Sequence, residues 1–273
     1  PDSTTLASGG DDGCIWLWDT NAGHARSRLT WGARFVFGIA WSGDGRSLAA
    51  GVEDNLILLR AENDEWRPVH RWRKHQGWVA CAAFSPDSQM LVSGGVDGVA
   101  YLWDAVQFSK RPLTMFVGGF GSIRSIIFAP DGRAIGAGGA TGVGIWKATE
   151  PEPVLFNRLR DADVRSVAFS PDGKLLVAAA GRCVISVDPQ THRAVEVLQA
   201  PANYFRCVAF TPDGKSLAIG CEDGTVRLWD TETSEEREAV EVSESSINCV
   251  AISPDQRTMA AAGDDFVVRL WDL

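Results

Sequence analysis

The sequence repeats one pattern seven times, with steps of 41 to 44 residues between equivalent positions. Each copy carries a short turn with Asp at its third position and ends in Trp-Asp or a substitute for that pair. The six complete turns begin at Ser42, Ser85, Ala129, Ser170, Thr211 and Ser253, and the chain opens on a shortened copy, Pro1-Asp2-Ser3. The copies end near residues 19, 60, 104, 147, 188, 230 and 272. Such a regular repeat favours an array of similar structural units over any irregular fold.

A single copy, residues 75–104, shows what each unit contains. The apolar run Val79–Phe84 predicts an inner strand buried on both faces, and Met90–Gly95 predicts a second strand. Asp97-Gly98 is the dipeptide that a tight hairpin favours, so it predicts a turn before a third strand, and a polar outer strand follows. Four short strands in about 40–45 residues are typical of one β-propeller blade. Residues 1–273 therefore predict an all-β fold, a single seven-bladed β-propeller domain with four-stranded antiparallel blades.

The net charge of −9 and the pI of about 5.0 argue against nonspecific binding of nucleic acids or anionic membranes. The segment 66–75 interleaves basic and aromatic residues as RNA-binding segments do, but an alternating outer strand explains it better in an acidic chain. Six cysteines are scattered, and Cys81, Cys207 and Cys249 share one repeat position where other copies have small residues. We therefore expect free thiols in a reducing, cytoplasmic compartment, with no metal site and no cofactor.

These repeats resemble the WD-repeat β-propeller family over essentially the whole chain. In that family, a hydrogen-bonded set of His, Ser or Thr, hairpin Asp and Trp ties the strands of a blade together. The resemblance implies such a set in the third repeat, formed by His75, Ser93, Asp97 and Trp103. It implies the same structural role for the hairpin aspartates Asp12, Asp54, Asp223 and Asp265, whereas Thr141 and Arg182 replace this residue in repeats four and five. Repeats two, four and five are degenerate, although we expect the ring to form because packing supplies most of its stability.

Two blades are incomplete in this sequence. The first repeat lacks an inner strand, and the last repeat stops before an outer strand. Propellers of the family that this chain resembles commonly close by pairing an N-terminal outer strand with three C-terminal strands. A single upstream segment of about 22 residues, an outer strand followed by an inner one, would complete both blades. We therefore expect the natural protein to extend N-terminally, into an additional domain of the same polypeptide.

The patterns that could carry catalysis are weak. Gly214-Lys215-Ser216 ends like a phosphate-binding loop, but Ala209 replaces the required glycine and the segment is a turn between strands. Adjacent acids before the hairpins resemble a metal or glycosidase pair, yet the second acid of each pair is the hairpin Asp that the turn already uses. We therefore predict that the chain is not an enzyme. The alternative is a propeller hydrolase that uses acids such as Glu222 and Asp264 at the central opening.

The resemblance also implies which side chains lie on the rim of the narrower face, which we call the top face. The residue before the hairpin Asp supplies four acids there, Asp11, Glu53, Glu222 and Asp264. Two inner-strand positions supply the aromatic residues Phe35, Phe37, Trp78 and Tyr204 and the arginines Arg124, Arg165 and Arg206. Aromatic and arginine side chains dominate protein interfaces, and arginine can hold a carboxylate or phosphate with two hydrogen bonds. The arginines also fit a repeat preference at that position, so both interpretations stay open.

Together these features predict a noncatalytic scaffold or sensor module that binds a protein or peptide at the top face and central opening. We expect the partner to carry an acidic or phosphorylated group, and we expect no nucleic acid or membrane ligand. By resemblance, the propeller would be the regulatory domain of a larger signalling protein. A purely architectural spacer is a third possibility, for which no single substitution on the top face would matter.

Overall fold

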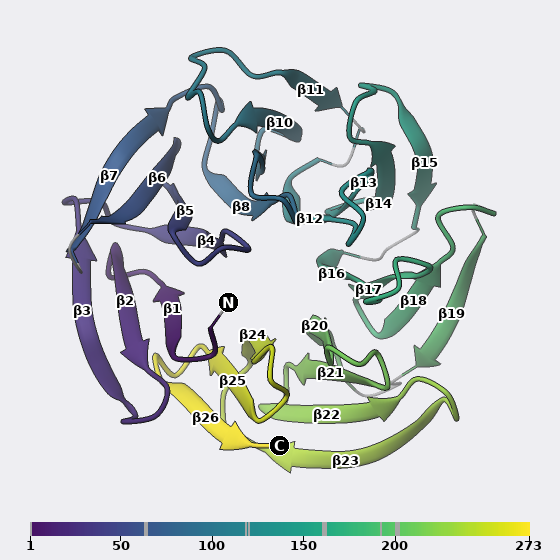
Figure 1. The fold of residues 1–273 in the computed structure, drawn as a ribbon. Helices are drawn as coiled ribbons and strands as arrows, with labels where there is room; N and C mark the ends of the chain where they lie inside the picture. Colours follow the sequence, from purple (N-terminus) through teal and green to yellow (C-terminus); the bar gives the residue numbers. More distant parts are fainter. Residues whose placement is uncertain are drawn as a thin grey trace.

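The computed structural model describes residues 2–62, 65–117, 119, 121–159, 163–191, 193–199 and 203–273, and Pro1 of the shortened first turn lies outside them. The described residues form strands and turns, and they contain no helix that is long and apolar enough to span a membrane. Seven antiparallel sheets stand around a central axis like the blades of a fan (Figure 1). The predicted all-β, seven-bladed propeller is therefore confirmed.

Within each blade the strands pair in chain order, from the centre of the ring outward. Blade one contains β1 (Thr5–Gly9), β2 (Cys14–Asp19) and β3 (His24–Thr30). Blade two contains β4 (Val36–Trp41), β5 (Ser47–Val52), β6 (Asn55–Glu62) and β7 (Glu65–Trp72). Blade three contains β8 (Val79–Phe84), β9 (Met90–Gly95), β10 (Val99–Asp104) and β11 (Thr114–Val117). Blade four contains β12 (Ile123–Phe128), β13 (Ala134–Gly139), β14 (Gly142–Lys147) and β15 (Pro153–Arg158).

The remaining three blades follow the same order. Blade five contains β16 (Val164–Phe169), β17 (Leu176–Ala180), β18 (Cys183–Val187) and β19 (Ala194–Gln199). Blade six contains β20 (Phe205–Phe210), β21 (Ser216–Cys221), β22 (Thr225–Asp230) and β23 (Glu235–Glu241). Blade seven contains β24 (Ile247–Ile252), β25 (Thr258–Gly263) and β26 (Val268–Asp272).

The repeated turn joins each complete inner strand to the second strand. In blade three, the Ser85 hydroxyl lies 2.5 Å from Asp87 Oδ1 and accepts the Met90 backbone N–H, while Asp87 Oδ1 accepts the Gln89 N–H. The fourth turn residue has a positive φ, which glycine adopts without strain. Glycine occupies this position in four of the complete turns, but Ser88 and Gln256 occupy it with a φ of 60°. The conserved geometry of the turn fixes where each inner strand ends.

The apolar cores lie between neighbouring blades. Phe116 of blade three and Trp146 of blade four are fully buried, with ring centroids 5.8 Å apart. The inner strands of blades two and three pack closely, because a Cβ atom on Gly38 would lie 2.7 Å from the Cys81 Cα atom. The degenerate blades two, four and five still form four-stranded sheets, as expected. In blade five, Val187 is fully buried in the position that Trp takes in other blades.

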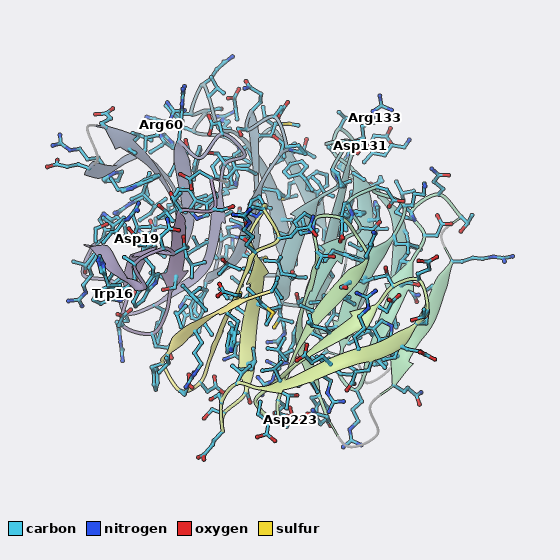
Figure 2. The ribbon with its side chains drawn as sticks, turned by 60° about the horizontal axis from the view of Figure 1, so that its bottom comes forward. Trp16, Asp19, Arg60, Asp131, Arg133 and Asp223 are labelled. Atoms are coloured by element: carbon cyan, nitrogen blue, oxygen red, sulfur yellow. The ribbon has the colours of Figure 1, made fainter. Side chains whose placement is uncertain are left out.

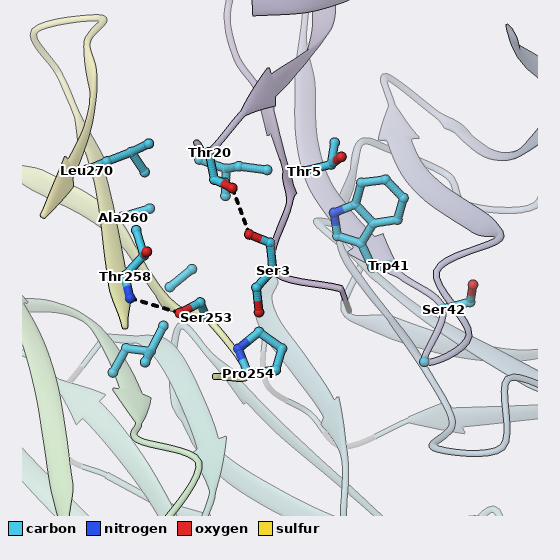
Figure 3. Close-up of a pocket in the computed structure, with 14 residues that line it drawn as sticks. Ser3, Thr5, Thr20, Trp41, Ser42, Ser253, Pro254, Thr258, Ala260 and Leu270 are labelled. Carbon is cyan, nitrogen blue, oxygen red and sulfur yellow. Dashed lines mark hydrogen bonds between the residues drawn. The ribbon is translucent and has the colours of Figure 1, made fainter. Parts of the chain in front are cut away.

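Blades one and seven are neighbours in the ring, and each has three strands in the described part of the chain, as predicted (Figure 1). β1 is the innermost strand of blade one, and β26 is the outermost strand of blade seven. A cavity of about 530 Å³ opens at this seam between blades seven, one and two. Its lining is largely apolar, with Trp41 on one side and Ala260 and Leu270 on the other (Figure 3).

Candidate functional site

Different turns form the two faces of the ring. Figure 2 shows Asp223, in a hairpin between second and third strands, at one end of the molecule. Asp131 and Arg133, in a turn that follows an inner strand, lie at the opposite end. The end with the hairpin aspartates is the top face.

The six described inner strands of blades two to seven share one irregularity. Each shifts register around its second residue, so that this residue has no partner on the second strand. The skipped residues are Phe37, Ala80, Arg124, Arg165, Arg206 and Asn248. Such bulges bend a strand and redirect the extra side chain, and they occur often beside functional sites. The bulge therefore gives six equivalent side chains a common direction that strand alternation alone would not give them.

All six bulge residues line one cavity of about 530 Å³ at the central opening. Trp78, Val96, Ser122, Ile123 and Asp264 complete the lining. The cavity brings together six of the predicted binding residues, Phe37, Trp78, Arg124, Arg165, Arg206 and Asp264. The other five lie elsewhere on or near the face and are described below.

The aromatic residues form a stack beside this cavity. The ring centroids of Phe35, Phe37 and Trp78 lie 5.1–5.5 Å apart, with interplanar angles of 21–44°. Phe37 and Trp78 remain 42% and 47% exposed, so they form an apolar platform open to solvent. Phe35 does not line the cavity but packs against both rings, and the Arg34 guanidinium lies 5.7 Å from its ring centroid. Contiguous exposed apolar surface of this kind marks interaction sites on soluble proteins.

The three arginines differ in how fully they are paired. Arg206 contacts Glu222 at 2.6 Å and reaches Asn248 and Ser246 at 3.5 Å, and its side chain is only 18% exposed. Arg124 contacts Asp163 at 2.7 Å, whereas Arg165 contacts the other oxygen of Asp163 at 3.4 Å. Burial of the Arg165 guanidinium, together with neighbouring Arg206, lowers the pKa of Arg165. Arg165 is therefore the least neutralised cation at the opening.

The four predicted acids do not form one sector of the cavity wall. Asp264 lines the cavity and accepts a 2.5 Å hydrogen bond from the Asn248 amide, while Glu222 is occupied by Arg206. Glu53 accepts the backbone N–H of Arg34 at 3.2 Å. Asp11 lines a separate cavity of about 380 Å³ between blades one and seven. Tyr204 is 45% exposed and lies under the Arg182 guanidinium, outside the central cavity.

The third repeat contains a continuous buried hydrogen-bond chain. The Nδ1 atom of His75 lies 3.1 Å from both Asp97 oxygens, and its Nε2 atom lies 2.9 Å from the Ser93 hydroxyl. The Trp103 indole N–H donates to the same hydroxyl at 2.9 Å. Burial lowers the pKa of His75, so the neutral ring donates from Nδ1 to Asp97 and accepts from Ser93. These four side chains tie three segments of one blade together.

The other hairpin aspartates are held by their own turns or by residues of neighbouring segments. Asp12 accepts the Cys14 backbone N–H and the Trp16 indole N–H, both within 3.0 Å. Asp223 accepts the backbone N–H and the hydroxyl of Thr225. The Ser243 hydroxyl lowers the pKa of Asp265 by donating to it at 2.7 Å. Asp54 is likewise bound, by the Asn55 amide at 2.7 Å and Arg73 at 2.7 Å.

Two side chains on this face, Asp163 and Phe266, stand out in the structure although the sequence alone assigned them no role. Asp163 bridges Arg124 and Arg165, and it is the acid at an inner-strand position where other repeats have aromatic or small residues. Phe266 is 88% exposed with a φ of 61°, and it occupies a hairpin position that is glycine in blades one, three and six. In the sequence, Phe266 could have been singled out because it replaces the glycine that follows the hairpin Asp in those blades. In the described part of the chain, no cluster of three or more His, Cys, Asp or Glu side chains could hold a metal ion.

Comparison with known proteins identifies the repeat. The WD domain, G-beta repeat family matches residues 1–19, 66–104, 156–187 and 239–272. The anaphase-promoting complex subunit 4 WD40 domain family matches residues 190–255. The chain belongs to the WD-repeat β-propeller family. The match over residues 66–104 covers blade three, which contains the set formed by His75, Ser93, Asp97 and Trp103.

Curated relatives share parts of this WD-repeat propeller. It is 38% identical over 106 residues to a ribosome biogenesis protein WDR12 homolog of Nematostella vectensis, covering 38% of this chain and 25% of that protein. It is 32% identical over 109 residues to WD repeat and SOCS box-containing protein 1 of Xenopus tropicalis, covering 40% and 26%. Protein HIR1 of Mycosarcoma maydis is 24% identical over 179 residues, covering 55% and 17%. The chain spans about a quarter or less of the length of these relatives.

Proposed function

We propose that this WD-repeat propeller is a noncatalytic scaffold or sensor module that binds a protein or peptide partner at the top face and central opening. One observation carries the proposal: a single cavity joins exposed aromatic rings to the incompletely paired Arg165. Aromatic and arginine side chains are enriched in the energetic centres of protein interfaces. Membership of the WD-repeat family supports a protein-interaction scaffold in general terms.

The proposal extends to the kind of partner and its setting. The arginines favour a partner that presents an acidic or phosphorylated group to the opening. The net charge of −9 disfavours nucleic acids and anionic membranes as ligands. We place the module in the cytoplasm, as the regulatory domain of a larger signalling protein with a further domain N-terminal to it.

A propeller hydrolase is the competing function, and the contacts of its two acids disfavour it. Hydrolysis of a glycoside needs two carboxyl groups flanking one reaction centre, one of them able to donate a proton. Only Asp264 of the proposed pair lines the central cavity, and it is bound to Asn248. Glu222 forms an ion pair with Arg206 at 2.6 Å. Both acids are better explained as fixing the positions of bulge residues.

The proposal is tested by comparing two double variants in affinity purification from the native lysate. Phe37→Ala/Trp78→Ala removes the platform, whereas Leu113→Ala/Met115→Ala removes apolar side chains of similar exposure on the outer part of blade three. We expect the partner to be recovered with the wild type and the control and lost with the platform variant. Equal recovery with all three proteins, each confirmed as folded by thermal unfolding, would contradict binding at the top face. Hydrolytic activity that the wild type shows and that Glu222→Gln or Asp264→Asn loses would instead support the hydrolase.

A further inference from the structure

The ion pairs at the central opening leave one arginine without a carboxylate of its own. Arg124, Arg165 and Arg206 contribute three positive charges, and the two carboxylates that contact them, Asp163 and Glu222, contribute two negative ones. Asp264 also lines the cavity but is bound to the Asn248 amide instead of an arginine. A ligand that enters therefore meets two arginines that share one carboxylate, Asp163, with Asp264 nearby.

Arg165 is the most weakly paired of the three arginines. Arg206 has three partners and is mostly buried, and Arg124 holds Asp163 at 2.7 Å. Arg165 has only the longer 3.4 Å contact to Asp163, through one terminal nitrogen, and its side chain is 40% exposed. A guanidinium carries five N–H donors, so Arg165 keeps donors that can meet a ligand from the cavity.

We propose that the ligand group that binds Arg165 is a single carboxylate, supplied by an Asp or Glu side chain or by a peptide C-terminus, and that a phosphoryl group binds less well. This inference rests on the proposed function. A carboxylate brings one negative charge and matches the planar fork of a guanidinium with two parallel hydrogen bonds. A phosphoryl group brings about 1.5 to 2 negative charges at neutral pH. It would exceed the single positive charge of Arg165 and be repelled more strongly than a carboxylate by Asp163 and Asp264.

The neighbouring aromatic stack determines what accompanies the carboxylate. Phe37 and Trp78 face each other at 5.1 Å with an angle of 25°, so their rings stack in a row and do not surround a space. A row of rings offers a flat apolar surface, whereas the binding of an alkylated ammonium requires rings on several sides. The Arg34 cation next to Phe35 further disfavours a positive group there. We therefore expect an apolar or aromatic ligand residue on the platform and a carboxylate at Arg165.

The test uses a synthetic peptide library and the purified 273-residue chain. Each peptide has blocked ends, one Leu or Trp, and one Glu, Gln, Ser or phosphoserine at every spacing up to six residues away. A parallel set carries its only carboxylate at a free C-terminus, which separates the two sources of the group. We expect the best Glu or C-terminal peptide to bind about tenfold more tightly than its Gln, Ser and phosphoserine counterparts, as loss of a charge-assisted fork predicts.

Two variants make the charge argument specific. Arg165→Gln should reduce the carboxylate peptide to the affinity of its Gln counterpart, while thermal unfolding reports that the ring is intact. Asp163→Asn raises the excess charge by one unit and removes repulsion, so it should shift the preference toward phosphoserine. A wild type that prefers phosphoserine, an Asp163→Asn variant without that shift, or a carboxylate series that does not bind would overturn the inference. If peptides bind without a carboxylate preference but lose affinity for Phe37→Ala/Trp78→Ala, the proposed function stands and only the carboxylate inference fails. If peptides bind the wild type and Phe37→Ala/Trp78→Ala equally well, both the inference and the proposed function are contradicted.

Discussion

Substitution of Ser93 by Ala tests whether the buried hydrogen-bond chain of blade three is a major source of stability. The Ser93 hydroxyl is fully buried and joins His75 Nε2 to the Trp103 indole N–H, each at 2.9 Å. Alanine leaves both nitrogens in the interior without this partner. A buried polar group that loses its partner costs about 1–3 kcal/mol, so we expect a loss of about 2–5 kcal/mol in the free energy of unfolding. In a domain of this size that corresponds to a fall of roughly 5–15 °C in Tm.

Ser8 provides a matched control, because it occupies the same position in blade one. Its hydroxyl accepts only the Trp18 indole N–H, at 2.8 Å, and Trp18 is partly exposed, so water can replace the lost contact. We expect Ser8→Ala to cost about 1 kcal/mol or less. Urea unfolding followed by circular dichroism, together with differential scanning calorimetry, measures both variants. Equal losses of unfolding free energy for Ser8→Ala and Ser93→Ala would refute the argument that burial determines how much the hydrogen-bond chain contributes to stability.

Three further predictions concern stability. Stability should fall as the pH drops from 7 to 5. In the unfolded chain His75 takes up a proton near the ordinary histidine pKa of 6.5, whereas burial lowers its pKa in the folded protein and keeps it neutral. His75→Gln should flatten the dependence of Tm on pH. Ser88→Gly and Gln256→Gly should each stabilise the protein by about 1 kcal/mol, because both residues hold a φ of 60°, and unchanged urea midpoints would contradict this. Gly38→Ala should destabilise by about 1–3 kcal/mol in the same assay, because its Cβ would overlap the backbone of β8.

The blades were predictable because every repeat contains local sequence signals for its own strands and turns. The turn at Ser85, the apolar inner strand and the Asp97-Gly98 hairpin each fix structure within a few residues, and the period then repeats them. Degenerate copies lose individual contacts without losing this pattern. Val187 replaces a Trp and is still fully buried, because the apolar surface of the neighbouring blade covers this position whether the side chain is large or small. Local sequence therefore determined the fold even where the hydrogen-bonded set is absent.

The arrangement of the site was less predictable, since it depends on which side chains pair within and between blades. Family resemblance placed Arg124, Arg165 and Arg206 at one position, but the register shift that turns them into the cavity is visible only in the paired strands. The acids share a repeat position too, yet their neighbouring residues give them different contacts. Glu222 finds an arginine on its own blade, whereas Asp11 faces a different cavity. Equivalent positions in a repeat thus share a direction but not a partner.

The seam between blades seven and one is where an additional strand could pair with the described structure. Among the described strands, β1 pairs only with β2, and the apolar cavity beside it exposes Ala251 of β24. A strand inserted there would pair with β1 and cover Ala251, and a second strand on β26 would complete blade seven. We therefore predict that a chain extended upstream shows slower amide hydrogen exchange in Thr5–Gly9 and a higher Tm than residues 1–273, whereas β17 in blade five exchanges equally in both. Unchanged exchange at β1 would contradict closure of the ring by an added upstream strand.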